Sequence, residues 1–132
     1  MRGSCLCGAV VYEVDQLAAP IQHCSCHTCR KAHAAAFNTA ADVRREHFRW
    51  VAGEAQLSRY ESSPGKLRYF CSTCGSQLVA DRQGRPTVVL RVATLDDDPQ
   101  VQPSQQIWKS HEVPWLAYGP QVPAFDEWEP GR

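Results

Sequence analysis

The seven cysteines of this 132-residue chain fall into three tight groups, and these groups carry most of its chemical potential. They form a C-x-C pair, a C-x-C-x-x-C triplet and a C-x-x-C pair, at Cys5 and Cys7, Cys24, Cys26 and Cys29, and Cys71 and Cys74. Zinc in proteins favours tetrahedral coordination by thiolates at about 2.3 Å. Cysteines one or two residues apart can bend round one ion where the backbone turns sharply. The spacing therefore predicts metal binding.

Two glycines support this interpretation. Gly8 directly follows Cys7, and Gly75 directly follows Cys74. Glycine tolerates a positive φ and lets backbone N–H groups point at the sulfurs. Those N–H groups would offset the negative charge that four thiolates place on a divalent ion.

Four ligands plus three suggest two sites and two zinc ions per chain. The two pairs can combine into a closed site that joins the N-terminal strand to the hairpin at Cys71, contributing on the order of 10 kcal/mol of metal-binding free energy. The triplet supplies three ligands and leaves a fourth position open, which is the pattern of catalytic zinc. Spacing alone does not establish which pairs share an ion.

Other interpretations of the cysteines remain open at this point. Buried cysteines are common as small hydrophobes, although seven in three tight groups disfavour that explanation. A thioredoxin-type redox motif would need a βαβ pattern around the C-x-x-C pair, and none is visible. His23 or His27 could complete the triplet as a closed structural site without catalysis. The remaining histidines, which lack ligand-like neighbours, are interpreted as surface or satisfied side chains: His33, His47 and His111.

Short strands are the elements that would carry these groups. Val10, Tyr12 and Val14 recur at the two-residue period of a strand. Strands are predicted over residues 8–14, 37–41, 47–51, 55–60, 66–70, 77–81 and 87–93. The strands on either side of residues 71–75 predict a hairpin, and the valine-rich strand 87–93 is expected at the centre of the sheet. A helical pattern is limited to one or two turns over residues 28–36.

The C-terminal third is expected to be an extended segment that covers the sheet. Six of the nine prolines lie at or after Pro99, which disfavours regular structure. Its aromatic side chains are expected to fasten the segment to the sheet: Trp108, Trp115, Tyr118, Phe125 and Trp128. The sequence thus predicts one mainly β domain over residues 1–132, with little helix and a Pro-rich C-terminal wrap.

The balance of charges excludes some classes of protein. Lysine and arginine number 14, aspartate and glutamate also number 14, and the pI is about 6.9. A general binder of nucleic acid or of membrane surfaces would show a basic excess. The sequence contains no apolar run long enough for a transmembrane helix and no secretory signal at its start. A cytoplasmic location is therefore expected, where cysteines stay reduced rather than forming disulfides.

At three segments the sequence resembles the glutathione-dependent formaldehyde-activating enzyme (GFA) family, which includes centromere protein V. These segments are GSCLCG at residues 3–8, HCSCHTCRK at 23–31 and YFCSTCGS at 69–76. A single C-x-x-C is a weak signal, but three such groups in this order and at these separations are highly specific. The resemblance extends from residue 3 to about residue 115.

The resemblance implies a fold, a division of the cysteines and an activity. The fold of this family is a "β-tent" of small, strongly coiled antiparallel sheets. The two cysteine pairs share a structural zinc, and the triplet holds a second zinc with an open position. The activity is the reversible joining of formaldehyde to the thiol of glutathione, a carbon–sulfur lyase reaction of the S-hydroxymethylglutathione synthase type. The implied partners are a small thiol such as glutathione and a small aldehyde.

A zinc-dependent carbon–sulfur lyase is accordingly the leading functional hypothesis. A free thiol has a pKa of roughly 8.5, so little thiolate exists at neutral pH without an open metal position. Three thiolates make zinc a weak Lewis acid, which favours capture of the thiol over activation of the aldehyde. Arg30, next to Cys29, is the candidate contact for a substrate carboxylate.

Two hypotheses without catalysis compete with the lyase. The first is a zinc-stabilised module that binds a macromolecule, as the resemblance to centromere protein V suggests. The second is a zinc-ribbon-like chaperone or exchange module with two structural metals. The absence of a basic tail disfavours nucleic acid as the macromolecule.

Overall fold

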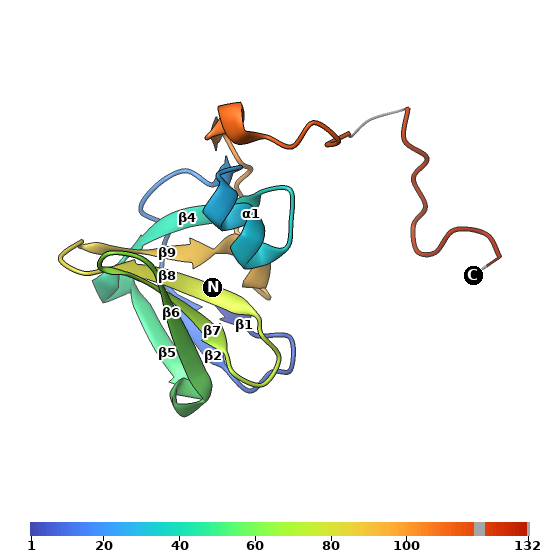
Figure 1. The fold of residues 1–132 in the computed structure, drawn as a ribbon. Coiled ribbons are helices and arrows are strands. Elements are labelled where there is room, and N and C mark those ends of the chain that lie inside the picture. The colour runs from blue at the N-terminus through green and yellow to red at the C-terminus, as the bar shows by residue number, and fades with distance from the viewer. Residues whose placement is uncertain (118–120, 132) are drawn as a thin grey trace.

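Two β-sheets dominate the computed structural model, which describes residues 1–117 and 121–131 (Figure 1). The smaller sheet has three antiparallel strands in the order β1-β2-β5, which are β1 (Arg2–Ser4), β2 (Val11–Val14) and β5 (Phe48–Ala52). The larger sheet has seven strands in the order β10-β3-β4-β9-β8-β7-β6. Its strands are β3 (Gln22–Cys24), β4 (Asn38–Arg44), β6 (Leu57–Ser63), β7 (Lys66–Cys71), β8 (Gln77–Arg82), β9 (Thr87–Arg91) and β10 (Gln105–Ile107).

The seven predicted strands all overlap observed strands, and β9 occupies the central position of the larger sheet, as expected. Its alternating apolar residues pack against the core while its neighbours β4 and β8 pair with it on both sides. The strands that the sequence did not indicate are β1, β3 and β10. Each has three residues, too few to show a period.

Helical structure is short, in agreement with the sequence. The helix α1 (His27–His33) begins after Cys26, whose sulfur accepts a hydrogen bond from the backbone N–H of Cys29, and ends at Ala34 in a left-handed conformation. The remaining helical pieces are 3₁₀ turns: η1 (Arg45–His47), η2 (Glu54–Gln56), η3 (Val92–Thr94) and η4 (Lys109–His111). No helix in the described part of the chain is long and apolar enough to cross a membrane.

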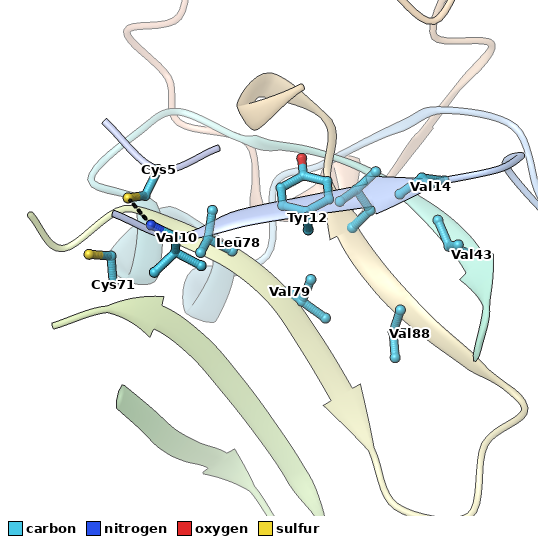
Figure 2. Packing of buried hydrophobic residues seen from close by; sticks show 10 residues of the cluster. Cys5, Val10, Tyr12, Val14, Val43, Cys71, Leu78, Val79 and Val88 are labelled. Carbon is cyan, nitrogen blue, oxygen red and sulfur yellow. Dashed lines mark hydrogen bonds between the residues drawn. The ribbon is translucent and has the colours of Figure 1, made fainter. Parts of the chain in front are cut away.

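The core lies between the two sheets (Figure 2). Val10, Tyr12 and Val14 enter it from the smaller sheet and are almost fully buried, as their two-residue period predicted. The larger sheet contributes Val43, Leu78, Val79, Val88 and Leu90. Burial of each such side chain stabilises the fold by about 1.5–3 kcal/mol. The hydroxyl of Tyr12 keeps a partner in Thr94 Oγ1 at 2.8 Å, so this buried polar atom is satisfied.

The aromatic side chains of the C-terminal segment do not fasten it to the sheet, so that prediction was wrong. The four described ones are at least half exposed, namely Trp108, Trp115, Phe125 and Trp128. Tyr118 lies outside the described residues. The first part of the segment is attached to the rest of the fold through β10 and the buried Val113. Each proline lacks the N–H that a further strand pairing needs, and the segment runs away from the sheets (Figure 1).

Candidate metal centres

The structure brings the two cysteine pairs together at one end of the core. The sulfurs of Cys5, Cys7, Cys71 and Cys74 all lie within 4.8 Å of one another. Cys7 Sγ is 3.5 Å from Cys5 Sγ and 3.8 Å from Cys71 Sγ. Four sulfurs at about 2.3 Å from a tetrahedral zinc are about 3.8 Å apart. This four-cysteine cluster therefore fits a metal ion of that size.

Local backbone structure holds the four-cysteine cluster in place. The backbone N–H of Val10 donates to Cys5 Sγ at 3.2 Å, a bond drawn in Figure 2. In the turn after β7, Gly75 N donates to the carbonyl of Cys71 at 2.9 Å. Gly8 and Gly75 both have positive φ, as their positions after cysteines predicted. The chain itself supplies the turns and donors that a thiolate cluster needs.

Ser76 joins the two halves of the four-cysteine cluster. Its hydroxyl accepts from the backbone N–H of Leu6 at 3.0 Å and lies 3.3 Å from Cys74 Sγ. The hydroxyl and the backbone N–H of Ser76 lower the pKa of Cys74 to about 5. The backbone N–H of Ala9 lowers the pKa of Cys7, but the Cys5 thiol, burial and the other two thiols of the cluster together outweigh it, and the pKa rises to about 11. A divalent cation would replace the proton that such crowded sulfurs otherwise retain.

The second group, the three-cysteine cluster, is built from six consecutive residues. Cys24 ends β3, Cys26 caps α1 and Cys29 lies in the first turn of α1, with all three sulfurs within 4.8 Å of one another. No histidine, aspartate or glutamate of residues 1–117 and 121–131 adds a fourth ligand atom to this group. Its donor set suits zinc, with three soft ligands and one position left over.

The two histidines that could have been a fourth ligand of the three-cysteine cluster, His23 and His27, have other surroundings. His23 Nδ1 is hydrogen-bonded to Thr39 Oγ1 at 2.9 Å, and the His23 ring packs on Phe37. His27 lines a pocket formed with β6 and β7. The arrangement therefore favours the three-thiolate set over a closed set with an imidazole.

Burial shapes the electrostatics of the three-cysteine cluster. It raises the pKa of Cys24 to about 12. Burial also raises the pKa of Cys26, but the N–H of Cys29, the thiols of Cys29 and Cys24 and the N–H of Thr28 together outweigh it, and the net pKa is lowered. The thiols of Cys24 and Cys26 thus have pKa values shifted in opposite directions before a metal binds.

Arg30, the candidate substrate contact, lies beside this cluster. Its Nε donates to the carbonyl of Ser25 at 3.2 Å and so braces the loop between Cys24 and Cys26. No other side-chain bond of Arg30 occurs within the described ranges. The guanidinium therefore keeps donors that an anion could use.

The sequence analysis missed three charged residues next to the three-cysteine cluster: Lys66, Arg68 and Arg91. The two arginines are only 4% exposed. Burial and the adjacent Arg68 lower the pKa of Arg91 to about 10, while the cysteine thiolates act in the opposite direction. Arginine inside an apolar strand such as 87–91 was the one signal available in the sequence.

His33 also differs from its sequence interpretation. Its Nε2 is buried without a hydrogen-bond partner. Burial, followed by the charges of Arg91 and Arg68, lowers the pKa of His33 to about 4. His33 is therefore neutral at physiological pH and borders a region of unusually high positive charge.

Comparisons with known proteins agree with the cysteine pattern. A family model described as glutathione-dependent formaldehyde-activating enzyme matches residues 1–111. The crystal structure of a Rhodobacter sphaeroides protein is similar to this chain, with 30% sequence identity and a TM-score of 0.65, covering 80% of this chain and 99% of that one. No curated protein matches the chain.

Proposed function

The chain belongs to the glutathione-dependent formaldehyde-activating enzyme family, and from this premise we propose that it is a zinc-dependent carbon–sulfur lyase. Its substrates would be a small thiol such as glutathione and a small aldehyde of the formaldehyde type. The observation that carries the proposal is the three-cysteine cluster, whose sulfurs converge with no fourth ligand atom among the described residues. An open position beside three thiolates suits capture of a fourth sulfur.

We assign different roles to the two clusters. Cys5, Cys7, Cys71 and Cys74 would hold a structural zinc, since they form a closed set of four. Cys24, Cys26 and Cys29 would hold a catalytic zinc. When bound there, zinc would supply a coordination position at which a thiol gives up its proton near neutral pH.

The reaction forms one carbon–sulfur bond. The substrate sulfur donates an electron pair to the carbonyl carbon of the aldehyde, the carbon–oxygen π bond opens, and the oxygen takes a proton to become a hydroxyl. The reverse reaction returns thiol and aldehyde. Arg30 would bind an anionic part of the substrate, because its guanidinium is braced by Ser25 and keeps further donors. The cations behind the cluster would favour the thiolate over the thiol.

The experiment that tests this function joins metal analysis to ligand binding. Cobalt-substituted protein should change its visible absorption when glutathione is added, because a fourth sulfur joins the three-cysteine cluster. S-methylglutathione, which lacks the thiol, is the matched control and should leave the spectrum unchanged. Mass spectrometry should then detect the thiol–aldehyde adduct formed faster than in buffer.

Opposite results would favour a different function. One metal ion or none per chain in metal-replete protein would contradict the two-site model. Two ions with a spectrum insensitive to glutathione would indicate a saturated second site, and thus the non-catalytic zinc-stabilised binding module.

A further inference from the structure

Two arginines behind the three-cysteine cluster are buried with unmet hydrogen-bonding capacity. Arg91 Nε and Nη2 and Arg68 Nη1 have no hydrogen-bond partner and almost no contact with solvent. Arg68 uses one donor, since its Nε bonds Ser62 Oγ at 2.9 Å. Buried guanidinium groups are normally paired with an anion, because leaving such a charge unpaired is costly. These two residues therefore indicate a missing anionic group.

The strands and α1 place the two arginines in the walls of adjacent pockets. Arg68 lies on β7 and Arg91 at the end of β9, with β8 between these strands. Arg68 lines a pocket of about 480 Å³, and Arg91 lines one of about 510 Å³. Ala32 of α1 and Gln77 of β8 line both pockets, so the two hollows adjoin beneath the helix. The buried Oε1 of Gln77 has no partner either.

Protein carboxylates do not balance this charge. The ion pairs of the described residues lie on other surfaces and involve Glu13, Asp15, Glu46, Asp81 and Glu112. Lys66, which is half-buried, adds a third positive charge. Burial and then the charges of Arg68 and Arg91 lower the pKa of Lys66, so the three cations lie close enough to repel one another. Lys31 of α1 lines the same pocket as Arg68 and adds a further cation. None of the ion pairs within residues 1–117 and 121–131 brings a carboxylate to these cations.

The metal cluster accounts for only part of the counter-charge. Three thiolates around a divalent ion carry one net negative charge, and a bound substrate thiolate would add a second. Positive charge is then still in excess. A carboxylate would reduce this excess and could accept hydrogen bonds from both guanidinium groups.

We propose that Arg68 and Arg91 form the binding site for a carboxylate of the thiol substrate, so that the protein selects thiols that carry a carboxylate beyond the sulfur. This inference rests on the proposed function for the thiol itself. Arg30 follows Cys29 directly in the chain, whereas Arg68 and Arg91 line the pockets beneath α1 and would bind a carboxylate farther from the substrate sulfur. Neutral thiols would reach the cluster but lack this second anchor.

The test compares glutathione with its diethyl ester, which keeps the thiol and masks both carboxylates. Calorimetric titration of the metal-loaded full chain should show glutathione binding at least tenfold more tightly than the ester. Arg91→Gln should weaken glutathione binding about tenfold and weaken ester binding much less, because the ester keeps the thiol but lacks the carboxylate. Arg59→Gln removes an exposed arginine on β6 that lines neither pocket and should bind both ligands as the wild type does.

The outcomes separate this inference from the function on which it rests. Equal binding of glutathione and the ester, with the cobalt spectrum changed by both, overturns the carboxylate site and leaves the thiol chemistry standing. Failure of both thiols to bind or to change the spectrum overturns the proposed function. If Arg91→Gln does not fold, Arg68→Gln serves as the second variant, because only a variant of this pair separates its contribution from that of Arg30.

Discussion

The two cysteine clusters satisfy their electrostatic needs in opposite ways. In the four-cysteine cluster the chain provides four sulfurs, backbone N–H donors and the hydroxyl of Ser76. In the three-cysteine cluster the chain provides three sulfurs and, close to them, two buried arginines with nitrogens that lack hydrogen-bond partners. The first cluster has its full set of ligand atoms and hydrogen-bond donors from the chain itself, whereas the second lacks a fourth ligand and partners for its buried arginines.

This difference shows where a ligand belongs better than pocket size does. A pocket of about 540 Å³ lies between the sheets, but its charged residues Arg45 and Asp81 already pair with each other. The pockets beneath α1 are no larger, yet nitrogens of Arg68 and Arg91 and the side-chain oxygen of Gln77 are buried there without hydrogen-bond partners. Unmet hydrogen bonding inside a protein is costly, so it marks the place that a partner occupies.

The largest expected effect is loss of the fold when the four-cysteine cluster is broken. Cys71→Ser removes a fully buried ligand that ties β7 to the N-terminal strand. Metal binding at such a site contributes on the order of 10 kcal/mol, which is comparable to the whole stability of a domain. Circular dichroism should therefore show an unfolded chain at 25 °C.

Thr73→Ala is the matched control, because Thr73 is exposed in the same turn and supplies no ligand. It should unfold at the temperature of the wild type. A folded Cys71→Ser protein with an unchanged unfolding midpoint would remove the structural role from this cluster.

The second effect should fall on activity and spare the fold. Cys29→Ser is expected to lower the metal content from two ions per chain to one and to abolish adduct formation, because the three-cysteine cluster loses a ligand. Stability should fall by only about 1–2 kcal/mol, since the cluster joins residues close in sequence. Cys26→Ser should behave alike. If these variants unfold as completely as Cys71→Ser, the division of roles between the clusters is wrong.

A smaller effect is expected at the turn that carries Cys74. Gly75→Ala forces a side chain onto a residue with φ of 79°, at a cost of about 1–2 kcal/mol. Gly84→Ala is the control, because Gly84 has the same φ, open space around it and no cysteine beside it. Thermal unfolding should show similar losses for both variants. Competition with a chelator should show faster metal loss in Gly75→Ala alone; equal rates would mean that the turn does not support the cluster.

The smallest effect concerns pH and the cationic region beside the three-cysteine cluster. The pKa of His33 is about 4 in the folded chain against an ordinary 6.5, so the unfolded chain binds a proton first as the pH falls. This histidine therefore favours folding fully above pH 6.5, and that contribution is lost between pH 6.5 and 4. Allowing for the partial exposure of the ring, the loss is about 1 kcal/mol.

His33→Gln should remove this part of the acid sensitivity. Urea unfolding at pH 7 and pH 5 gives the free energy of unfolding at each pH. The fall in this free energy between the two pH values should be smaller for the variant than for the wild type, and any effect of metal loss is common to both proteins. His111→Gln, at an exposed position, is the control, and its free energy of unfolding should depend on pH as that of the wild type does. If the free energy of unfolding of His33→Gln depends on pH as that of the wild type does, groups other than His33 cause the acid sensitivity.

Much of the site could be predicted from the sequence because its ligands are close together in the chain. The spacing of Cys24, Cys26 and Cys29 brings three sulfurs round one turn wherever the segment lies. The strand 87–93 was predicted near its true position and at the centre of the sheet, since its run of valines is typical of a buried strand.

The parts that could not be predicted depend on pairing between distant segments. Arg68 and Arg91 are 23 positions apart, and only the order β9-β8-β7 brings them beneath one helix. The strand β10 exists because β3 offers it an edge, not because its three residues favour extended structure. The exposed Trp115 and Trp128 show the converse, since apolar side chains fasten a segment only where the backbone can pair or pack.

The span of each cluster along the chain also sets an order of events during biosynthesis. The contact between Cys7 and Cys71 bridges 64 positions, so the closed cluster forms only after most of the polypeptide has left the ribosome and the β7–β8 hairpin has formed. The sulfurs from Cys24 to Cys29 emerge almost together and can capture a metal while the chain is still growing. The three-cysteine cluster would thus bind its metal early in synthesis, and the four-cysteine cluster would bind its metal later.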